Sequence, residues 1–235
     1  MPVAKRILCL ANSKKMSGRC VAGREVLDTA PGSWIRPVSA RPTEEVSEDE
    51  RQYQDGSDPR VLDIIDVPLI RHQQHACQTE NWLLDHSYYW TKVRQVGWAE
   101  LQLYVENPVT LWTNTRSTYN GANDEILQAD ADEFLNSLVL IRVPNLELMV
   151  FAPGAAFGNP KRRVLADFQY RGIRYALWVT DPVIERDYKA RADGKYPLGE
   201  CCLCVSLGEP LQKQNGESYR YKLVAAVIQR EDVRP

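Results

Sequence analysis

Residues 6–42 read RILCLANSKKMSGRCVAGREVLDTAPGSWIRPVSARP. The apolar run at residues 7–10 is short and is bounded by charged and turn-forming residues, which is typical of a buried strand. A second short run, at residues 20–23, follows a polar loop and predicts a strand hairpinned onto the first. Arg36 precedes a proline, which disfavours a helical backbone, so residues 34–38 are expected to be extended. The stretch predicts a β framework that carries cations and one large aromatic ring.

The composition sets limits on the class of protein. A chain of 235 residues accommodates one large β unit or two domains of roughly 100 residues each. Hydrophobic residues make up 44% of the chain, which is enough to build ordinary cores. The formal net charge of −2 implies no global attraction to nucleic acid. Any binding to nucleic acid must therefore come from local patches of positive charge.

Positive and negative charge are concentrated in separate segments. Residues 1–42 contain eight Lys or Arg and two acids, a balance of +6. Residues 43–66 contain nine acids and two Arg, a balance of −7. Residues 161–191 contain eight cations and four acids, a balance of +4. Two basic segments could each contribute to an anion-binding surface, and ordinary solvated surface is the alternative for each of them.

The sequence also bears on compartment and on the cysteines. It contains no run of 18 apolar residues, so we expect no membrane span. The apolar stretch near the N-terminus is too short for a secretory signal, and we expect a cytoplasmic protein. In that compartment the six cysteines are expected to be free thiols and not a disulfide framework.

The N-terminal half mixes strands with insertions. Residues 61–70 are rich in β-branched residues and predict a strand. Residues 43–59 are acidic and nearly free of large aliphatic residues, which fits either a short helix capped by Thr43 or a mobile loop. Residues 88–104 fit one or two helical turns broken near Gly97.

The C-terminal half has the pattern of a small β domain. Residues 164–170 and 173–180 alternate apolar and polar side chains around Arg171-Gly172, which is the clearest hairpin in the chain. Further strands are predicted at residues 138–143, 146–151, 202–207 and 221–228, the first two joined by a turn at Pro144-Asn145. Five or six short strands in about 100 residues indicate a small barrel or sandwich. We place a domain boundary near Asn136.

Several motifs together carry a resemblance to a known family. They are CLANSKKMSGRCVAG (residues 9–23), GSWIRPVS (32–39), YQDGSDPRVLDIIDVPL (53–69), QTENW (78–82), YALWVTDP (175–182), CLCVSLGEP (202–210) and YKLVAAVI (221–228). As a set they resemble bacterial proteins described as dual OB-containing domains, over nearly the whole chain. The resemblance implies a mostly β fold with short helices, in which two OB-like β-barrels stand in tandem. The first barrel, with helical and loop insertions, would occupy residues 1–135 and the second residues 136–235.

The resemblance also implies a ligand class, namely nucleic acid or a nucleotide-like molecule, in antiviral defence loci. OB barrels bind single strands by stacking bases on aromatic rings while cations follow the phosphates. The candidates for these roles lie in the two basic segments. They are Lys14, Lys15, Arg19, Trp34 and Arg36 in the first domain, and Lys161, Arg162, Arg163, Tyr170, Arg171 and Arg174, with Tyr175, in the second.

Two of these candidates have a structural alternative. Trp is buried on average, so Trp34 also fits a core residue. Arg36 would then pair with the acidic segment at residues 43–66. Under that alternative Lys14, Lys15 and Arg19 remain the better candidates for ligand contact.

The sequence also contains residues that could form three other kinds of site. His72, His75, Cys77 and His86 lie close in sequence, and Cys201, Cys202 and Cys204 form a second cluster, but neither spacing matches a familiar zinc site. Cys20 lies in basic surroundings that would lower its thiol pKa, yet no GxSxG, HExxH or P-loop pattern accompanies it. The polar and aromatic residues 78–90 could read a nucleobase, or could pack on the barrel.

The sequence therefore predicts a binding protein without catalytic residues, metal or cofactor. The expected partner is single-stranded DNA or RNA, with the chain acting as a recognition component of a bacterial defence system. Two alternatives remain: a protein-interaction module that contacts an effector, and an enzyme that processes nucleotides.

Overall fold

The computed structural model describes residues 3–230, which form two compact units. The first unit contains the described residues up to Val105 and the short segment Leu135–Ser137. The second unit contains Glu106–Phe134 and Leu138–Arg230. This division differs from the domains expected from the sequence, because residues 106–134 belong to the second unit. They do so because strand β7 (Glu125–Leu127) pairs with the last strand of that unit, β13 (Ser218–Gln229).

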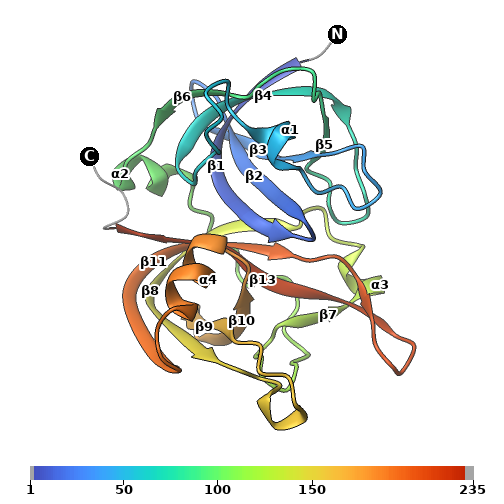
Figure 1. Ribbon diagram of the computed structural model, residues 1–235, viewed down its shortest axis with the longest axis vertical. Helices are drawn as coiled ribbons and strands as arrows, with labels where there is room; N and C mark the ends of the chain where they lie inside the picture. Colours follow the sequence, from blue (N-terminus) through green and yellow to red (C-terminus); the bar gives the residue numbers. More distant parts are fainter. Residues whose placement is uncertain (1–2, 231–235) are drawn as a thin grey trace. The chain divides into compact units, whose positions relative to one another are not determined.

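The first unit is built on a closed five-stranded barrel (Figure 1). Its strands are β1 (Val3–Lys15), β2 (Gly18–Val26), β3 (Pro31–Val38), β4 (Asp63–His72) and β5 (Asn81–Leu84). They follow each other around the barrel in the order β1-β2-β3-β5-β4, and β4 pairs back onto β1. The pair β3–β5 is parallel, whereas the other neighbours are antiparallel.

Short helices and one extra strand are attached to this barrel. They are α1 (Glu48–Arg51), β6 (Thr91–Gln95), α2 (Trp98–Leu101) and the 3-10 turn η1 (Gln102–Tyr104). The acidic segment does form a helix, but its cap is Ser47 and not Thr43: the Ser47 hydroxyl accepts the Glu50 amide, and the Glu50 carboxylate accepts the Ser47 amide. Residues 91–95 were expected to be helical and instead form β6, because they pair with β4.

The second unit is a closed five-stranded barrel of the same kind. Its strands are β8 (Leu138–Phe151), β9 (Arg163–Tyr170), β10 (Ile173–Val179), β11 (Gly194–Leu207) and β13, with helix α4 (Pro182–Lys189) between β10 and β11. The order β10-β9-β8-β11-β13 closes where β10 meets β13 in parallel. Smaller elements are β7, α3 (Gln128–Ala131), η2 (Ala155–Phe157) and β12 (Leu211–Gln212).

The hairpin at Arg171-Gly172 is confirmed. Tyr170 faces Ile173 across a two-residue turn, and both turn residues have positive φ, as a type I′ turn requires. The turn expected at Pro144-Asn145 is wrong, because β8 runs unbroken through these residues. It pairs with β11 on both sides of them, and the irregularity is taken up on β11 around Gly199.

Each barrel has its own apolar core, made by alternate residues of its strands. In the first barrel the core includes Ile7, Cys9, Val21, Ile35, Ile65, Val67, Leu69 and Trp90. In the second it includes Ile141, Val143, Leu148, Val164, Ala166, Phe168, Tyr175, Leu177, Leu203 and Val224. Both barrels have the strand order of the OB-fold, in which the third strand pairs in parallel with the fifth. None of the helices among residues 3–230 is long and apolar enough to cross a membrane.

Candidate nucleic-acid interface

The fold itself indicates where a ligand would bind. In OB barrels the outer face of the second and third strands, with the loops joining strands 1–2 and 4–5, binds oligonucleotides and oligosaccharides. In the second barrel these are the strands β9 and β10, the loop at residues 152–162 and the loop at residues 208–217. The side chains of β9 and β10 that point away from the core are therefore the first to consider.

Alternation along the two strands decides which side chains point outward. Val164, Ala166, Phe168 and Tyr170 belong to the core, so Arg163 and Asp167 occupy the outer face of β9. On β10 the core residues are Tyr175, Leu177 and Val179, which leaves Arg174 and Trp178 outside. The hairpin thus carries two arginines and one tryptophan on its outer face.

Arg163, Trp178 and Phe151 form a cation–aromatic cluster on this face. The Arg163 guanidinium lies 4.0 Å from the centroid of the Trp178 ring, and the Phe151 ring centroid lies 5.7 Å from that of Trp178. All three side chains are half-buried. In the described part of the chain Arg163 makes no salt bridge, and burial lowers the pKa of its guanidinium. The Glu185 carboxylate acts on Arg163 electrostatically but does not form a salt bridge with it. A flat ring system beside such a cation is what base stacking and phosphate binding require.

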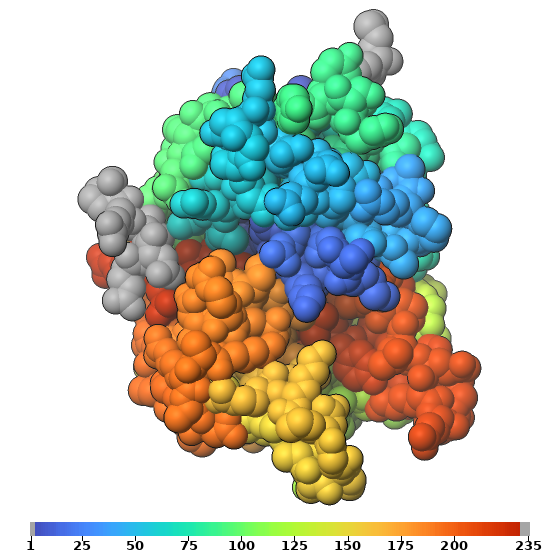
Figure 2. Space-filling view, in the orientation of Figure 1, coloured from blue at the N-terminus to red at the C-terminus, as the bar shows by residue number. Residues whose placement is uncertain are grey.

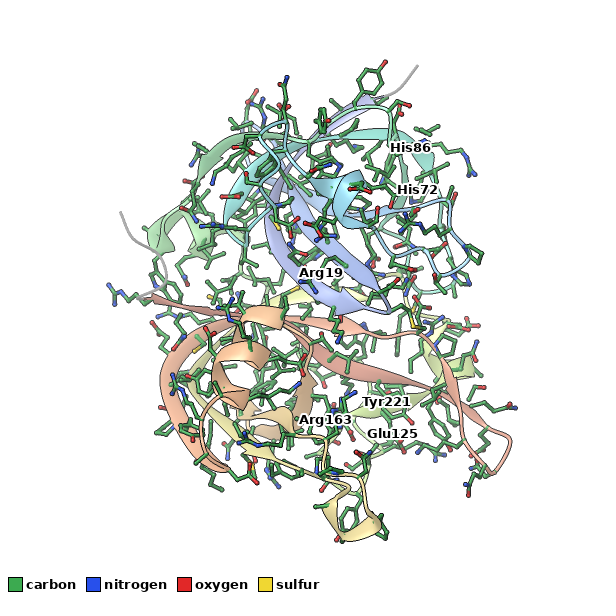
Figure 3. All side chains as sticks on the ribbon, in the orientation of Figure 1. Arg19, His72, His86, Glu125, Arg163 and Tyr221 are labelled. Atoms are coloured by element: carbon green, nitrogen blue, oxygen red, sulfur yellow. The ribbon has the colours of Figure 1, made fainter. Side chains whose placement is uncertain are left out.

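The loop between β8 and β9 extends this face. It is drawn in gold and projects from the surface of the second barrel in Figure 2. Its Phe157 is 87% exposed, and the Lys161 side chain is exposed as well. Figure 3 marks Arg163, the first residue of β9, directly after this loop. Phe157, Lys161 and the Arg163–Trp178–Phe151 cluster therefore lie on consecutive segments of one barrel.

The other second-barrel candidates are used inside the fold. Arg174 makes a two-pronged salt bridge with Asp167 on the neighbouring strand. Arg162 donates to the backbone carbonyls of Lys189 and Arg191 at the end of α4 and pairs with Asp193. These two arginines therefore bind groups of the folded chain itself.

Tyr170 and Arg171 hold the segment that precedes β7. The Tyr170 hydroxyl donates to the Pro108 carbonyl at 2.9 Å, and the Arg171 guanidinium donates to the Asn107 carbonyl at 3.2 Å. Tyr170 is buried, so its ring is not presented for stacking.

In the first barrel the three cations of the β1–β2 hairpin come together. Lys14 pairs with Arg19 across the ladder, Lys15 pairs with Gly18, and Met16 takes a positive φ in the turn. Lys14 is exposed, whereas Lys15 and Arg19 are half-buried. The backbone of Arg19 also exchanges two hydrogen bonds with Val46. This hairpin is the loop between strands 1 and 2, which is a ligand-binding position in OB barrels.

Trp34 and Arg36 lie in the interior. Trp34 is 8% exposed and Arg36 is 3% exposed. The acid that pairs with Arg36 is Glu80, at 2.9 Å, and the same guanidinium donates to the Ser137 hydroxyl at 2.9 Å. The partner expected within residues 43–66 is therefore wrong. Glu80 is the residue just before β5. Because β5 pairs in parallel with β3, Asn81 lies opposite Arg36, and this brings Glu80 to the Arg36 side chain.

The histidine and cysteine clusters do not assemble into a metal centre. Among residues 3–230 no three His, Cys, Asp or Glu side chains come close enough to hold an ion. The His72 ring contacts the Thr79 carbonyl and lies 5.3 Å from the Trp82 ring. Cys77, Cys201, Cys202 and Cys204 are buried.

Three residues of the outer face were missed from the sequence. Trp178 could have been found, because it follows Arg174 at a spacing of four residues on one strand and so shares its face. Phe151 is the last residue of a predicted strand, and only the ladder shows that it lies opposite Arg163. Phe157 carries no local signal, since it lies in an irregular loop.

The comparisons with known proteins address the family. Neither the curated proteins nor the solved structures include one that matches the chain. The model of the dual OB-containing domain matches residues 5–227, which include both barrels. The two barrels, their shared strand order and this match lead to one conclusion: the chain belongs to the DuOB family of dual OB-containing domains.

Proposed function

We propose that the chain binds single-stranded nucleic acid on the outer face of β9 and β10. The observation that carries this proposal is the Arg163–Trp178–Phe151 cluster, with a cation 4.0 Å from the tryptophan ring and no salt bridge on that cation within the described residues. A base stacked on such a ring contributes about 1–3 kcal/mol, and every base offers a face for stacking. Membership in a family of OB barrels supports the same ligand class.

Phosphate contacts would come from cations on each barrel. Lys161 and Arg163 are the candidates in the second barrel, and Lys14, Lys15 and Arg19 are the candidates in the first. With a net charge of −2, the affinity depends on these local groups and not on the whole chain. The binding should therefore be sensitive to salt, because each neutralised phosphate releases condensed counterions.

The test is a titration of labelled single-stranded DNA and RNA of about 20 nucleotides at about 50 mM and about 200 mM salt. We expect saturable binding at the lower salt, with the logarithm of the affinity falling by about 0.7 per phosphate contact for each tenfold rise in salt. A duplex of the same sequence is the control and should bind more weakly, since its bases are already stacked. Absence of binding to either single strand at low salt removes the proposal.

A second candidate, the binding of a partner protein, is favoured by an exposed edge of the first barrel. All five residues of β6 are exposed, including the hydrophobic Val93. Tyr88 and Tyr89, which precede this strand, are also exposed. An exposed edge strand offers backbone groups to an extended peptide. A partner that is retained after nuclease treatment, and lost on Tyr88→Ser/Tyr89→Ser, would support this candidate.

The role in bacterial antiviral defence, which the resemblance implies, stays a prediction. It is tested by comparing phage plating on cells with and without an intact gene for this chain. Equal plating efficiency across a broad phage panel would count against it.

A further inference from the structure

The second barrel contains a lysine whose side chain is wholly buried. Lys222, on β13, is 0% exposed, and its neighbour Val224 points into the barrel core. The Lys222 ammonium donates to the Thr113 carbonyl at 2.6 Å and to the Asn114 side-chain oxygen at 2.9 Å. It also lies 5.2 Å from the centroid of the Tyr175 ring, on β10. Both of its hydrogen-bond acceptors are uncharged, and among residues 3–230 it has no salt bridge.

A buried ammonium normally lies beside a carboxylate. The carboxylate that acts on Lys222 electrostatically is that of Asp124, but it accepts hydrogen bonds from the Thr118 amide and hydroxyl instead. Burial lowers the pKa of Lys222 to about 7, an effect that Asp124 offsets only in part. A negatively charged group placed beside the ammonium would therefore stabilise its charged form.

The two acceptors come from a short irregular segment, residues 110–114, which we call the plug. The plug lies near the seam between β10 and β13, where the two strands pair only at Trp178–Leu223 and Val179–Val224. The Tyr175 hydroxyl contacts the Thr110 hydroxyl at 3.1 Å and accepts the Leu111 amide at 3.3 Å. Tyr175 and Lys222 thus hold the plug by four polar contacts, and Leu111 is its buried apolar anchor.

The plug has a strained backbone. Trp112 has a φ of +57°, a conformation that a bulky side chain rarely adopts. Such strain persists only where surrounding contacts enforce it, and it occurs often at ligand clamps and switch segments. Tyr175 and Lys222 hold the residues on both sides of Trp112, and the Trp112 side chain packs against the barrel core. Opening of the plug would release the strain together with two oxygen acceptors.

We propose that Lys222 and Tyr175 form a second binding site, for a terminal phosphate group, and that the plug fills this site in the closed chain. The oxygens of Thr113 and Asn114 take the places of two phosphate oxygens at the ammonium. A terminal phosphate supplies the negative charge that the neutral acceptors lack, and an ammonium attracts an anion in a buried site more strongly than it attracts a neutral oxygen. The seam is flanked by β10 and β13. The end of a nucleic-acid chain, or a free nucleotide, can reach it more easily than an internal nucleotide of the chain can.

The test uses the full-length chain and adenosine 5′-monophosphate, followed by calorimetry. We expect the monophosphate to bind, adenosine to fail, and Lys222→Met to weaken binding about tenfold or more. Lys195→Met is the matched control, because Lys195 is an exposed lysine on β11 of the same barrel, paired with Glu147. Equal binding of adenosine and its monophosphate, or unchanged affinity in Lys222→Met, would overturn the proposal.

Two further measurements test the plug. Leu111→Ala removes its apolar anchor and should tighten monophosphate binding severalfold, since a larger share of molecules is then open. Asn114→Ala is the alternative if that variant fails to fold. Hydrogen exchange in a peptide containing residues 108–116 should speed up at saturating monophosphate, and unchanged exchange would contradict displacement of the plug.

The source of the phosphate is distinguished by competition. Displacement of the monophosphate by a 5′-phosphorylated oligonucleotide, and not by the same oligonucleotide without its phosphate, assigns the site to a strand end. Failure of both oligonucleotides to compete assigns it to free nucleotides. This site does not depend on the outer face of β9 and β10, so either proposal can fail while the other stands.

Discussion

Arg36 and Arg163 are arginines of the two basic segments, and the folded chain uses them differently. Arg36 is buried against Glu80 and Ser137, whereas Arg163 lies over Trp178 without a salt bridge in the described residues. The sequence marks both residues only as arginines of a basic segment. Glu80 is remote in the chain, and only the parallel pairing of β3 with β5 brings it to Arg36. Local sequence therefore could not separate the structural arginine from the candidate ligand contact.

Removal of the Arg36 side chain should destabilise the first barrel. Arg36→Ala leaves the Glu80 carboxylate buried without its cation, and loss of one partner from a buried pair costs about 3–5 kcal/mol. Arg6→Ala is the control, because its salt bridge with Asp66 is exposed and should contribute about 1 kcal/mol or less. Urea unfolding measures both. If both variants lose the same free energy of unfolding, the buried Arg36–Glu80 pair contributes no more to stability than an exposed pair does.

Lys222 makes stability depend on pH. Burial lowers its pKa from 10.5 in the unfolded chain to about 7, so the unfolded state binds more protons between these values. The free energy of unfolding should therefore rise with pH across this window, by about 1.4 kcal/mol per pH unit from this group. Among the described residues, the charged group that acts on its ammonium is Asp124, which opposes the shift.

The measurement compares the wild-type chain with Lys222→Met by urea unfolding at about pH 6 and about pH 9. The wild-type stability minus that of the variant should be larger at the higher pH. A constant difference would mean that Lys222 titrates as an ordinary lysine, and a difference that falls as pH rises would also contradict a lowered pKa.

At the level of elements, alternation and turn chemistry were good guides where strands have one buried face. The β9–β10 hairpin follows from period-two alternation around Arg171-Gly172. Strand β6 was missed because all five of its residues are exposed, so no alternation marks it. The continuity of β8 through Pro144 was missed because a Pro-Asn pair usually ends a strand, and here the irregularity lies on its neighbour β11.

Helix α4 depends on the residue that caps its N-terminus, Asp181. The Asp181 carboxylate accepts the amides of Val183 and Ile184, and its second oxygen accepts the amide of Val227 on β13. Asp181→Ala should therefore lower the free energy of unfolding by about 0.5–2 kcal/mol or somewhat more. Asp187→Ala on the exposed side of the same helix should have little effect. If the two variants are equally stable in thermal unfolding, the cap does not fix α4 to the barrel.

At the level of the whole molecule, the tandem of two OB barrels was predictable from the chain, whereas the candidate binding face was not. Motifs spread over nearly the whole sequence carried the family, and the match to residues 5–227 confirms it. Of the eleven candidate residues named from the sequence, Trp34, Arg36 and Tyr170 are buried, and Arg162, Arg171 and Arg174 bind protein groups. Tertiary contacts decide which of these side chains are buried or paired, and the number of cations in a segment does not reveal those contacts.

The binding of single strands on the second barrel is the central claim, and Trp178 tests it most directly. Anisotropy titration of a labelled single strand should show that Trp178→Leu weakens binding about 5- to 150-fold, which corresponds to the loss of one stacked base. Trp82→Leu is the matched control, because Trp82 is also half-buried beneath a cation, Lys5 at 4.6 Å, but belongs to β5 of the first barrel. It should bind within about twofold of the wild type. Equal affinity of the Trp178→Leu variant and the wild type would contradict the account.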